Sequence, residues 1–236
     1  MPDAIFFDMD ATLIFWSTPA ETVWESLARR YAVEANGVEP GALLGVINRT
    51  RDWYWGDLER HRTGRLDLYQ ARREIVRLAL TGLNIVNPEL ADKIADEFTL
   101  LREKDEAVAP EDIAVLKHLG ERGLRLALIT NGGADVQRAK IKKFGLAPYF
   151  DNILIEGEFG CGKPDERVFK HTLDKLKVKP SNTWMIGDDL ARDIAPCRAL
   201  GIYSLWVNGK GDDSHHLEGV RPDKIIKSIS EIPDLL

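Results

Sequence analysis

Cysteines are scarce in this sequence and long apolar runs are absent, and each shortage excludes a class of protein. Only two cysteines, Cys161 and Cys197, occur among 236 residues, too few for a disulfide framework, so we expect reduced thiols. No window approaches the ~18 uncharged apolar residues of a transmembrane helix. The chain enters an apolar segment almost at once, without the basic region, apolar core and cleavage site of a signal peptide. We therefore expect a soluble, cytoplasmic protein with no membrane partner.

A basic tail, internal repeats and low-complexity segments are also absent. The net charge of −6 argues against nucleic acid as a partner. A hydrophobic share of 44% over this length is enough for a sizeable core, in one large domain or in a domain with an insertion. The sequence leaves the oligomeric state open.

An apolar run that ends on two aspartates stands near the start of the chain. Ile5–Phe7 has the composition of a buried strand in a parallel sheet, and Asp8 and Asp10 follow it. Open parallel sheets bind ligands at the carboxyl ends of their strands, and buried carboxylates there need a cation or hydrogen bonds. These residues predict a metal-assisted site with Asp8 as candidate nucleophile. Taken alone, the pattern fits an ordinary strand-to-loop turn equally well.

The next ninety or so residues have helical periodicity throughout. Capping and stop signals predict four consecutive helices: from Thr18–Glu21 toward Asn36-Gly37, from Pro40 to about Arg62, from Asp67 to Thr81, and from Asn87-Pro88 onward. With no strand between them, they predict an inserted helical cap domain over residues 16–107. We expect it to act as a lid above Asp8 and Asp10.

From Pro110 onward, predicted helices and strands alternate. The predicted strands cover 125–129, 153–155, 183–187, 202–206 and 224–226; the predicted helices cover 111–122, 134–144, 165–177 and 191–200. This alternation is typical of a doubly wound, Rossmann-like parallel sheet with helices on both faces. The predicted α/β core domain comprises residues 1–15 and 108–236.

Two further polar segments fall at or beyond strand ends. Thr130, Asn131 and Gly132 offer a hydroxyl, an amide and backbone N–H groups that can hold an anion, although Asn-Gly is also a common turn. Lys163, before Pro164, is a point charge suited to phosphate, but a lone loop lysine is usually just solvated.

A third segment adds carboxylates. Asp188 and Asp189 end another strand, and Asp193 follows shortly after. Several acids converging beside one lysine would repel each other without a divalent cation. A hard, oxygen-ligated ion such as Mg²⁺ fits these ligands.

Taken in order, these motifs resemble the haloacid dehalogenase-like hydrolase superfamily, in its phosphatase branch. The motifs are Asp8-x-Asp10-x-Thr12, Thr130-Asn131-Gly132, Lys163-Pro164 and Gly187-Asp188-Asp189 with Asp193. The resemblance implies that Asp8 attacks phosphorus and forms an aspartyl-phosphate. It implies that Asp10 protonates the leaving oxygen and then takes a proton from the hydrolytic water.

The resemblance also implies roles for the other motif residues. Thr130 and Lys163 would hold the transferring phosphoryl group, Asn131 with Gly132 would position it or the nucleophile, and Thr12 would orient Asp10 or its loop. Mg²⁺ would be bound by Asp8, the backbone carbonyl of Asp10, and Asp188, with Asp189 or Asp193 behind them.

Two positions bear on the details of this resemblance. Ala11 stands where the superfamily most often has glycine or asparagine, so alanine costs about 1 kcal/mol if the position needs a positive φ. Asp10 is usually missing from haloacid dehalogenases, whose halide leaves without a proton. Its presence therefore favours a phosphatase.

The substrate is less constrained by the sequence. The predicted cap holds several aromatic and cationic residues: Trp16, Trp24, Trp53, Tyr54, Trp55, Arg49, Arg51, Arg60, Arg62 and Arg65. They could select a sugar or nucleotide phosphate with a second anionic group, but packing of the cap and solvation explain them more simply. Trp184 and Trp206 lie on predicted strands, so we assign them to the core. His215-His216 could hold a metal, but an exposed loop is the simpler interpretation.

The segments 128–163 and 206–209 look most like the sugar-phosphate and nucleotide phosphatases of the superfamily, such as N-acylneuraminate-9-phosphate phosphatases and pyrimidine nucleotidases. The principal hypothesis is an Mg²⁺-dependent phosphatase acting on a small phosphorylated metabolite. The alternatives are a sugar phosphomutase, a 2-haloacid dehalogenase and a phosphate-binding module without catalysis.

Overall fold

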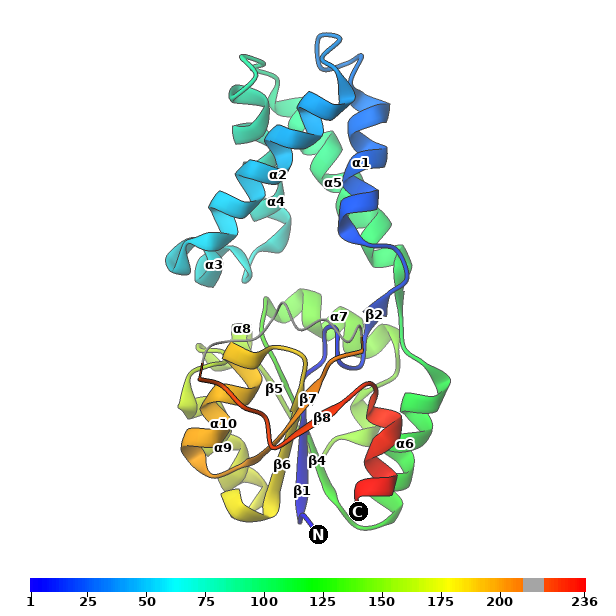
Figure 1. Ribbon diagram of the computed structural model, residues 1–236, viewed down its shortest axis with the longest axis vertical. Coiled ribbons are helices and arrows are strands. Elements are labelled where there is room, and N and C mark those ends of the chain that lie inside the picture. The colour runs from blue at the N-terminus through cyan, green and yellow to red at the C-terminus, as the bar shows by residue number, and fades with distance from the viewer. Residues whose placement is uncertain (210–218) are drawn as a thin grey trace. The chain divides into compact units, whose positions relative to one another are not determined.

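Figure 1 shows the computed structural model, in which residues 1–209 and 219–236 are described. His215 and His216 lie outside the described residues. The chain divides into two compact units, one formed by Met1–Phe15 with Ala107–Leu236 and the other by Trp16–Glu106. Within the described ranges, no helix combines the length and apolar character needed to cross a membrane.

The first unit contains a six-stranded parallel sheet, as the sequence predicts for an α/β doubly wound fold. The strand order is β5-β4-β1-β6-β7-β8. The strands are β1 (Ala4–Phe7), β4 (Arg125–Thr130), β5 (Asn152–Ile155), β6 (Thr183–Gly187), β7 (Tyr203–Val207) and β8 (Lys224–Ile226). Strand β1 lies between β4 and β6, so the strand order reverses around it. Such a reversal is where ligands bind in open α/β sheets.

Burial on both faces explains the continuous apolar character of β1. All four of its residues are buried, and successive side chains point to opposite faces. Phe6 joins an apolar cluster with Val168 and Phe169 of α9 (Glu166–Leu176). Helix α6 (Pro110–Glu121) and the C-terminal 3₁₀ segment η5 (Ile229–Leu235) pack together away from α9, so helices cover both sides of the sheet (Figure 1).

Shorter elements complete this unit and lead into the site. They are α7 (Ala134–Lys143), η1 (Ala147–Tyr149), α8 (Glu156–Phe159), η2 (Pro180–Asn182), the π-helical turn η3 (Leu190–Ile194) and α10 (Ala195–Leu200). The chain passes between the units through two short strands, β2 (Phe15–Trp16) and β3 (Glu106–Ala107).

The second unit is helical. Its helices are α1 (Ala20–Tyr31), α2 (Pro40–Gly56), α3 (Leu58–Gly64), α4 (Leu68–Thr81) and α5 (Pro88–Asp105). The side chains of Asp67 and Asn87 cap α4 and α5, each accepting a hydrogen bond from a first-turn N–H. The indole of Trp24 stacks on Phe98 with 3.9 Å between ring centroids, in the apolar centre of this unit.

Two of the predicted helices differ from the sequence expectation. Helix α1 ends at Tyr31 rather than near Asn36, and its start has no side-chain cap. The helix expected from Pro40 to about Arg62 is divided, because Asp57 is extended and its side chain accepts a hydrogen bond from the N–H of Arg60, which starts α3. A strong N-cap residue inside an otherwise helical pattern thus creates two helices from one.

The aromatic and cationic residues of the helical unit mostly have partners within it. Tyr54 is buried, and Arg60 donates to the carbonyl oxygens of Trp53 and Tyr54. Arg62 pairs with Glu59. Trp53, by contrast, is 55% exposed, although the guanidinium group of Arg60 lies 3.8 Å from the centre of its ring. Packing and local ion pairs therefore account for most of these residues, as the simpler interpretation predicts.

Candidate active site

Four strands of the first unit end in polar residues. Asp8 follows β1, Thr130 closes β4, Glu156 follows β5 and Asp188 follows β6. Because β4, β1 and β6 are adjacent and parallel, these side chains leave the sheet at the same edge. Strand β5 pairs with β4 and adds Glu156 at the same edge.

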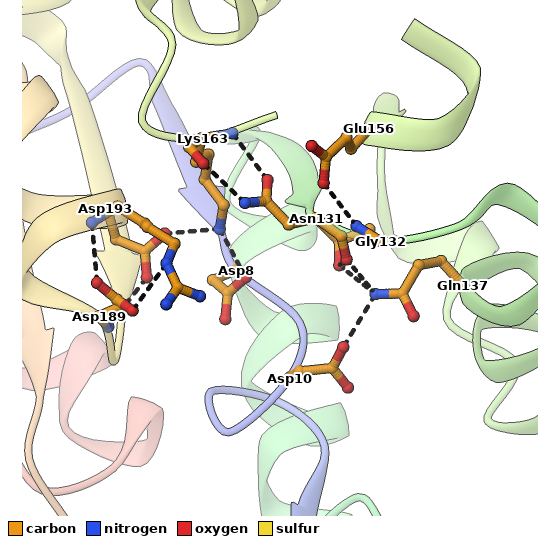
Figure 2. A network of polar contacts seen from close by, with 11 residues as sticks. Asp8, Asp10, Asn131, Gly132, Gln137, Glu156, Lys163, Asp189 and Asp193 are labelled. Carbon is orange, nitrogen blue, oxygen red and sulfur yellow. Dashed lines mark hydrogen bonds and ion pairs between the residues drawn. The ribbon is translucent and has the colours of Figure 1, made fainter. Parts of the chain in front are cut away.

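Lys163 lies at the centre of the site, with its side chain only 2% exposed. Its Nζ atom is 2.6 Å from an oxygen of Asp8 and 2.6 Å from an oxygen of Asp193 (Figure 2). Burial alone would lower the pKa of Lys163, but Asp193 and Asp8 outweigh burial and raise the pKa above its ordinary value. The lysine is therefore a buried, permanently charged ammonium group rather than the solvated loop residue that was its simpler interpretation.

Three carboxylates cluster around this ammonium group. Asp8, Asp188 and Asp193 each have an oxygen atom within 4.8 Å of the others. Burial raises the pKa of Asp188, and the neighbouring charges of Asp8 and Asp193 raise it further. Burial raises the pKa of Asp193 as well, and its ion pair with Lys163 offsets only part of that effect.

The charges of this cluster fit a divalent cation. With all three carboxylates ionised, the cluster and its one ammonium group would carry a charge of about −2, and all the ligand atoms on offer are carboxylate oxygens. Burial first, and then the charges of Asp8 and Asp193, raise the pKa of Asp188, and a bound cation would favour its ionised form against both effects. The residues therefore fit a divalent metal ion held by oxygen ligands.

Two neighbouring residues shape the carboxylate cluster. The indole N–H of Trp206, a buried core residue, donates to the backbone oxygen of Asp188 at 2.8 Å. Gly187 precedes Asp188, and a Cβ atom there would collide with the carboxylate of Asp193. Only glycine lets β6 pass this close to that side chain.

Asp189 has a different role from its neighbours. Its carboxylate accepts hydrogen bonds at 2.9 Å from the N–H groups of Ala191 and Arg192, so it caps the π-helical turn η3. The same turn brings Asp193 back toward Lys163. Of the two residues expected behind the metal ligands, Asp193 lies in the cluster, and Asp189 is not in it.

Asn131 joins the Thr130 loop to the Lys163 loop. Its side-chain nitrogen donates to the backbone oxygen of Lys163 at 2.7 Å, and its side-chain oxygen accepts from the N–H of Lys163 at 2.7 Å. This reciprocal pair fixes the backbone that carries the ammonium group. Gly162 makes the approach possible, because a Cβ there would lie 2.6 Å from the Asn131 oxygen.

Gly132 forms a second link of this kind. Its φ is 120°, a conformation that favours glycine. Its N–H donates to the carboxylate of Glu156 at 3.0 Å, and its carbonyl oxygen accepts from the N–H of Gly157 at 3.0 Å. The N–H of Gly132 thus holds Glu156, which is 3% exposed.

Asp10 is held by helix α7. Gln137 donates to one oxygen of Asp10 at 2.9 Å, and Lys140 lies 2.7 Å from the other. Directly after Asp10, Ala11 adopts φ 64°, so this position does need the left-handed conformation in which alanine is strained. Thr12 is buried, and its hydroxyl oxygen has no hydrogen-bond partner among the described residues.

Sequence reasoning missed Gln137, Lys140 and Glu156. Glu156 directly follows a predicted strand, so the strand-end signal that selected Asp8 and Asp188 could have found it. Gln137 and Lys140 lie three residues apart on a predicted helix, and so on one face, but ordinary surface residues show the same spacing.

Comparison with known proteins covers most of this chain. The family model described as haloacid dehalogenase-like hydrolase matches residues 2–201. A phosphoserine phosphatase of Thermus thermophilus is 32% identical over 235 residues, covering 93% of this chain and 90% of that protein.

Two further similarities are a sequence match over about half of the chain and a match to a solved structure. The rat N-acylneuraminate-9-phosphatase is 33% identical over 127 residues, and the match covers 53% of this chain and 51% of that protein. The crystal structure of a 2-haloacid dehalogenase from Pseudomonas syringae superposes with a TM-score of 0.62 at 28% identity, covering 100% of this chain and 98% of the other.

Proposed function

Because the chain belongs to the haloacid dehalogenase-like hydrolase family, we propose that it is a Mg²⁺-dependent phosphatase that acts through an aspartyl-phosphate. It is a hydrolase, and its curated relative of nearly full length is a phosphatase. The observation that carries the proposal is the pairing of Asp8 with the buried ammonium group of Lys163. A second aspartate, Asp10, follows Asp8 by two residues and is held in place by side chains of its own.

Asp8 is the proposed nucleophile. Lys163 binds one of its oxygens, and among the described residues its other oxygen has no partner, which leaves that oxygen available for attack or for a metal ion. The attacking oxygen forms a bond to phosphorus as the bond from phosphorus to the leaving oxygen breaks. Lys163, already charged, stabilises the negative charge of the transferring phosphoryl group together with Thr130.

Asp10 is the proposed acid and base. It gives a proton to the leaving oxygen in the first step and takes one from the water that hydrolyses the aspartyl-phosphate in the second. In this proposal Asn131 acts by fixing Lys163, Gly132 by fixing the loop through Glu156, and Thr12 by supporting the loop that carries Asp10.

The metal site is proposed to use Asp8, the backbone carbonyl of Asp10, and Asp188, with Asp193 behind them. When bound, Mg²⁺ would neutralise the phosphoryl oxygens and orient them toward Asp8. Asp189, which caps η3, would support the position of Asp193 rather than bind the ion.

The proposed substrate is a small phosphorylated metabolite, and the predicted cap domain, residues 16–107, is proposed to select it. The relatives named above suggest a phosphorylated amino acid or an acidic sugar phosphate, beside the nucleotides suggested by sequence. We propose a cytoplasmic enzyme without nucleic-acid or membrane partners. Its two free thiols and acidic balance support this proposal.

The test measures phosphate release from phosphoserine, N-acylneuraminate 9-phosphate and a pyrimidine nucleoside monophosphate, each with Mg²⁺ and with a chelator. Asp8→Asn is assayed beside the wild-type protein. We expect Mg²⁺-dependent release from at least one compound, abolished by the substitution, with a phosphate-labelled wild-type protein trapped by acid quench.

Other outcomes point to the alternatives. Interconversion of sugar-phosphate isomers without phosphate release would identify a mutase. Halide release from 2-chloropropionate that survives the chelator would identify a dehalogenase, the activity of the Pseudomonas syringae protein. Binding of phosphate analogues without turnover of any compound would leave a module that has lost catalysis.

A further inference from the structure

Both carboxylate oxygens of Asp10 have a partner from helix α7. Lys140 Nζ lies 2.7 Å from Oδ1, and Gln137 Nε2 donates to Oδ2 at 2.9 Å. A carboxylate that is held at both oxygens cannot rotate about its terminal bond, so the direction in which it presents a proton is fixed.

Gln137 also ties Asp10 to the end of β4. Its side-chain nitrogen lies 2.6 Å from the hydroxyl oxygen of Thr130. The same nitrogen lies 2.9 Å from the carbonyl oxygen of Asn131 (Figure 2). Its side chain faces a carboxylate and a carbonyl oxygen, which are acceptors, so the amide nitrogen must be the atom turned toward them. The residue is 2% exposed, which is costly for an amide unless such bonds are made.

Lys140 adds a charge to this arrangement. Its side chain is only 12% exposed, and it stands on the same face of α7 as Gln137, one turn further along the helix. Its neighbour Lys142 is exposed. The helix therefore directs one of its lysines to the carboxylate of Asp10 and another to solvent.

We propose that Gln137 and Lys140 are positioning residues for Asp10. This inference rests on the proposed function, in which Asp10 gives a proton to the leaving oxygen. A carboxyl oxygen that carries a proton keeps a lone pair, so both side chains can still donate to Asp10 while its O–H points to the leaving oxygen. Loss of either partner lets the carboxyl group rotate away from the leaving oxygen.

The test compares two phosphate esters whose leaving groups differ in how much they need a proton. The leaving group of an alkyl phosphate is a strongly basic alkoxide, which needs a proton to depart. The leaving group of p-nitrophenyl phosphate is p-nitrophenolate, which is stable without one. The ratio kcat/KM reports the step that breaks the ester bond, and general acid catalysis contributes about 10²- to 10⁴-fold. We therefore expect Lys140→Met to lower kcat/KM for the alkyl phosphate by about 30-fold or more and for p-nitrophenyl phosphate by less than about threefold.

Three variants control the experiment. Lys142→Met removes a lysine from the exposed side of the same helix and is expected to leave both values unchanged. Lys140→Arg keeps the charge and is expected to recover part of the loss. Gln137→Met tests the second partner, with thermal unfolding measured because the residue is buried.

The outcomes separate this inference from the proposed function. If the wild-type protein releases no phosphate from either ester, the proposed function fails. If the wild-type protein is active and Lys140→Met slows both esters equally, or neither, the positioning role is wrong. A loss confined to the alkyl phosphate supports it.

Discussion

Replacing Asp188 by asparagine should stabilise the metal-free protein, although it removes a proposed metal ligand. Burial, together with the charges of Asp8 and Asp193, raises the pKa of Asp188 to about 8 from an ordinary value near 3.8. Each pKa unit corresponds to about 1.36 kcal/mol, so ionisation of Asp188 opposes folding by up to about 6 kcal/mol. Because the clustered carboxylates share protons, we take about half of that, ~3 kcal/mol, for the single substitution.

The sign of the effect depends on pH. Below the pKa of the unfolded chain, Asp188 is protonated in both states and the substitution changes little. As the pH rises toward 8, the unfolded chain ionises first, so the wild-type protein loses stability that the asparagine variant keeps. The advantage of the variant should therefore grow from pH 4 and be largest at and above pH 8.

Urea denaturation in the presence of a chelator, at pH 5 and at pH 8, measures this difference. We expect Asp188→Asn to raise the free energy of unfolding by about 2–3 kcal/mol at pH 8, and by less than half as much at pH 5. Mg²⁺ at 100 times its dissociation constant should then stabilise only the wild-type protein, by about 2.7 kcal/mol. A variant less stable than the wild type at pH 8 in chelator would refute the electrostatic account of this cluster.

Three further substitutions test other parts of the first unit. Ala11→Gly should raise the free energy of unfolding by about 0.5–1 kcal/mol, because relief of the left-handed strain at φ 64° exceeds the entropy that glycine adds to the unfolded chain. The control Ala114→Gly, at an exposed position inside helix α6, should lower it by about 1 kcal/mol in the same urea titration. Burial, and then Glu111, raise the pKa of Asp112 to about 6. Asp112→Asn should therefore stabilise the protein by about 1–2 kcal/mol at pH 8, a figure that allows for the lost attraction between the carboxylate and the N-terminus of its helix. The gain should vanish below pH 4, and a gain that does not change with pH would contradict this cause. Lys163→Met leaves buried carboxylates without their cation and should cost about 3–5 kcal/mol in chelator; a cost below 1 kcal/mol would show that the ion pairs are unimportant for stability.

The sequence predicts well those parts of the site that depend on strand order alone. Carboxyl ends of parallel strands meet at one edge, so Asp8, Thr130 and Asp188 could be brought together without knowing any loop. Lys163 follows no strand, and its central place depends on Asn131, whose side chain fixes the lysine backbone from another loop. No local pattern predicts such a contact between loops.

Other features depend on competition between neighbouring residues of the same type. Asp189 and Asp193 are chemically identical, and only the π-helical turn between them makes one a helix cap and the other a partner of Lys163. Asp57 similarly divides a segment whose apolar pattern is continuous. In both cases a side chain competes with the helix for backbone N–H groups, and tertiary packing decides the result.

The central place of β1 governs the order in which this chain can fold. Ala4 pairs with both Arg125 and Thr183, so β1, which is synthesised before these partner strands, cannot pair with them until the chain beyond the whole helical unit has emerged. Once folded, the helical unit lowers the entropic cost of bringing β1 to its partner strands. Ser17 and the N–H of Thr18 both bind Asp105, which ties its first residues to its last. An unfolded insertion of this length would have to be closed at an entropic cost that grows with the logarithm of its length, whereas the folded unit presents two adjacent ends. The folded helical unit thus shortens the effective separation between β1 and its partner strands, so the sheet can assemble as if these strands were close in sequence.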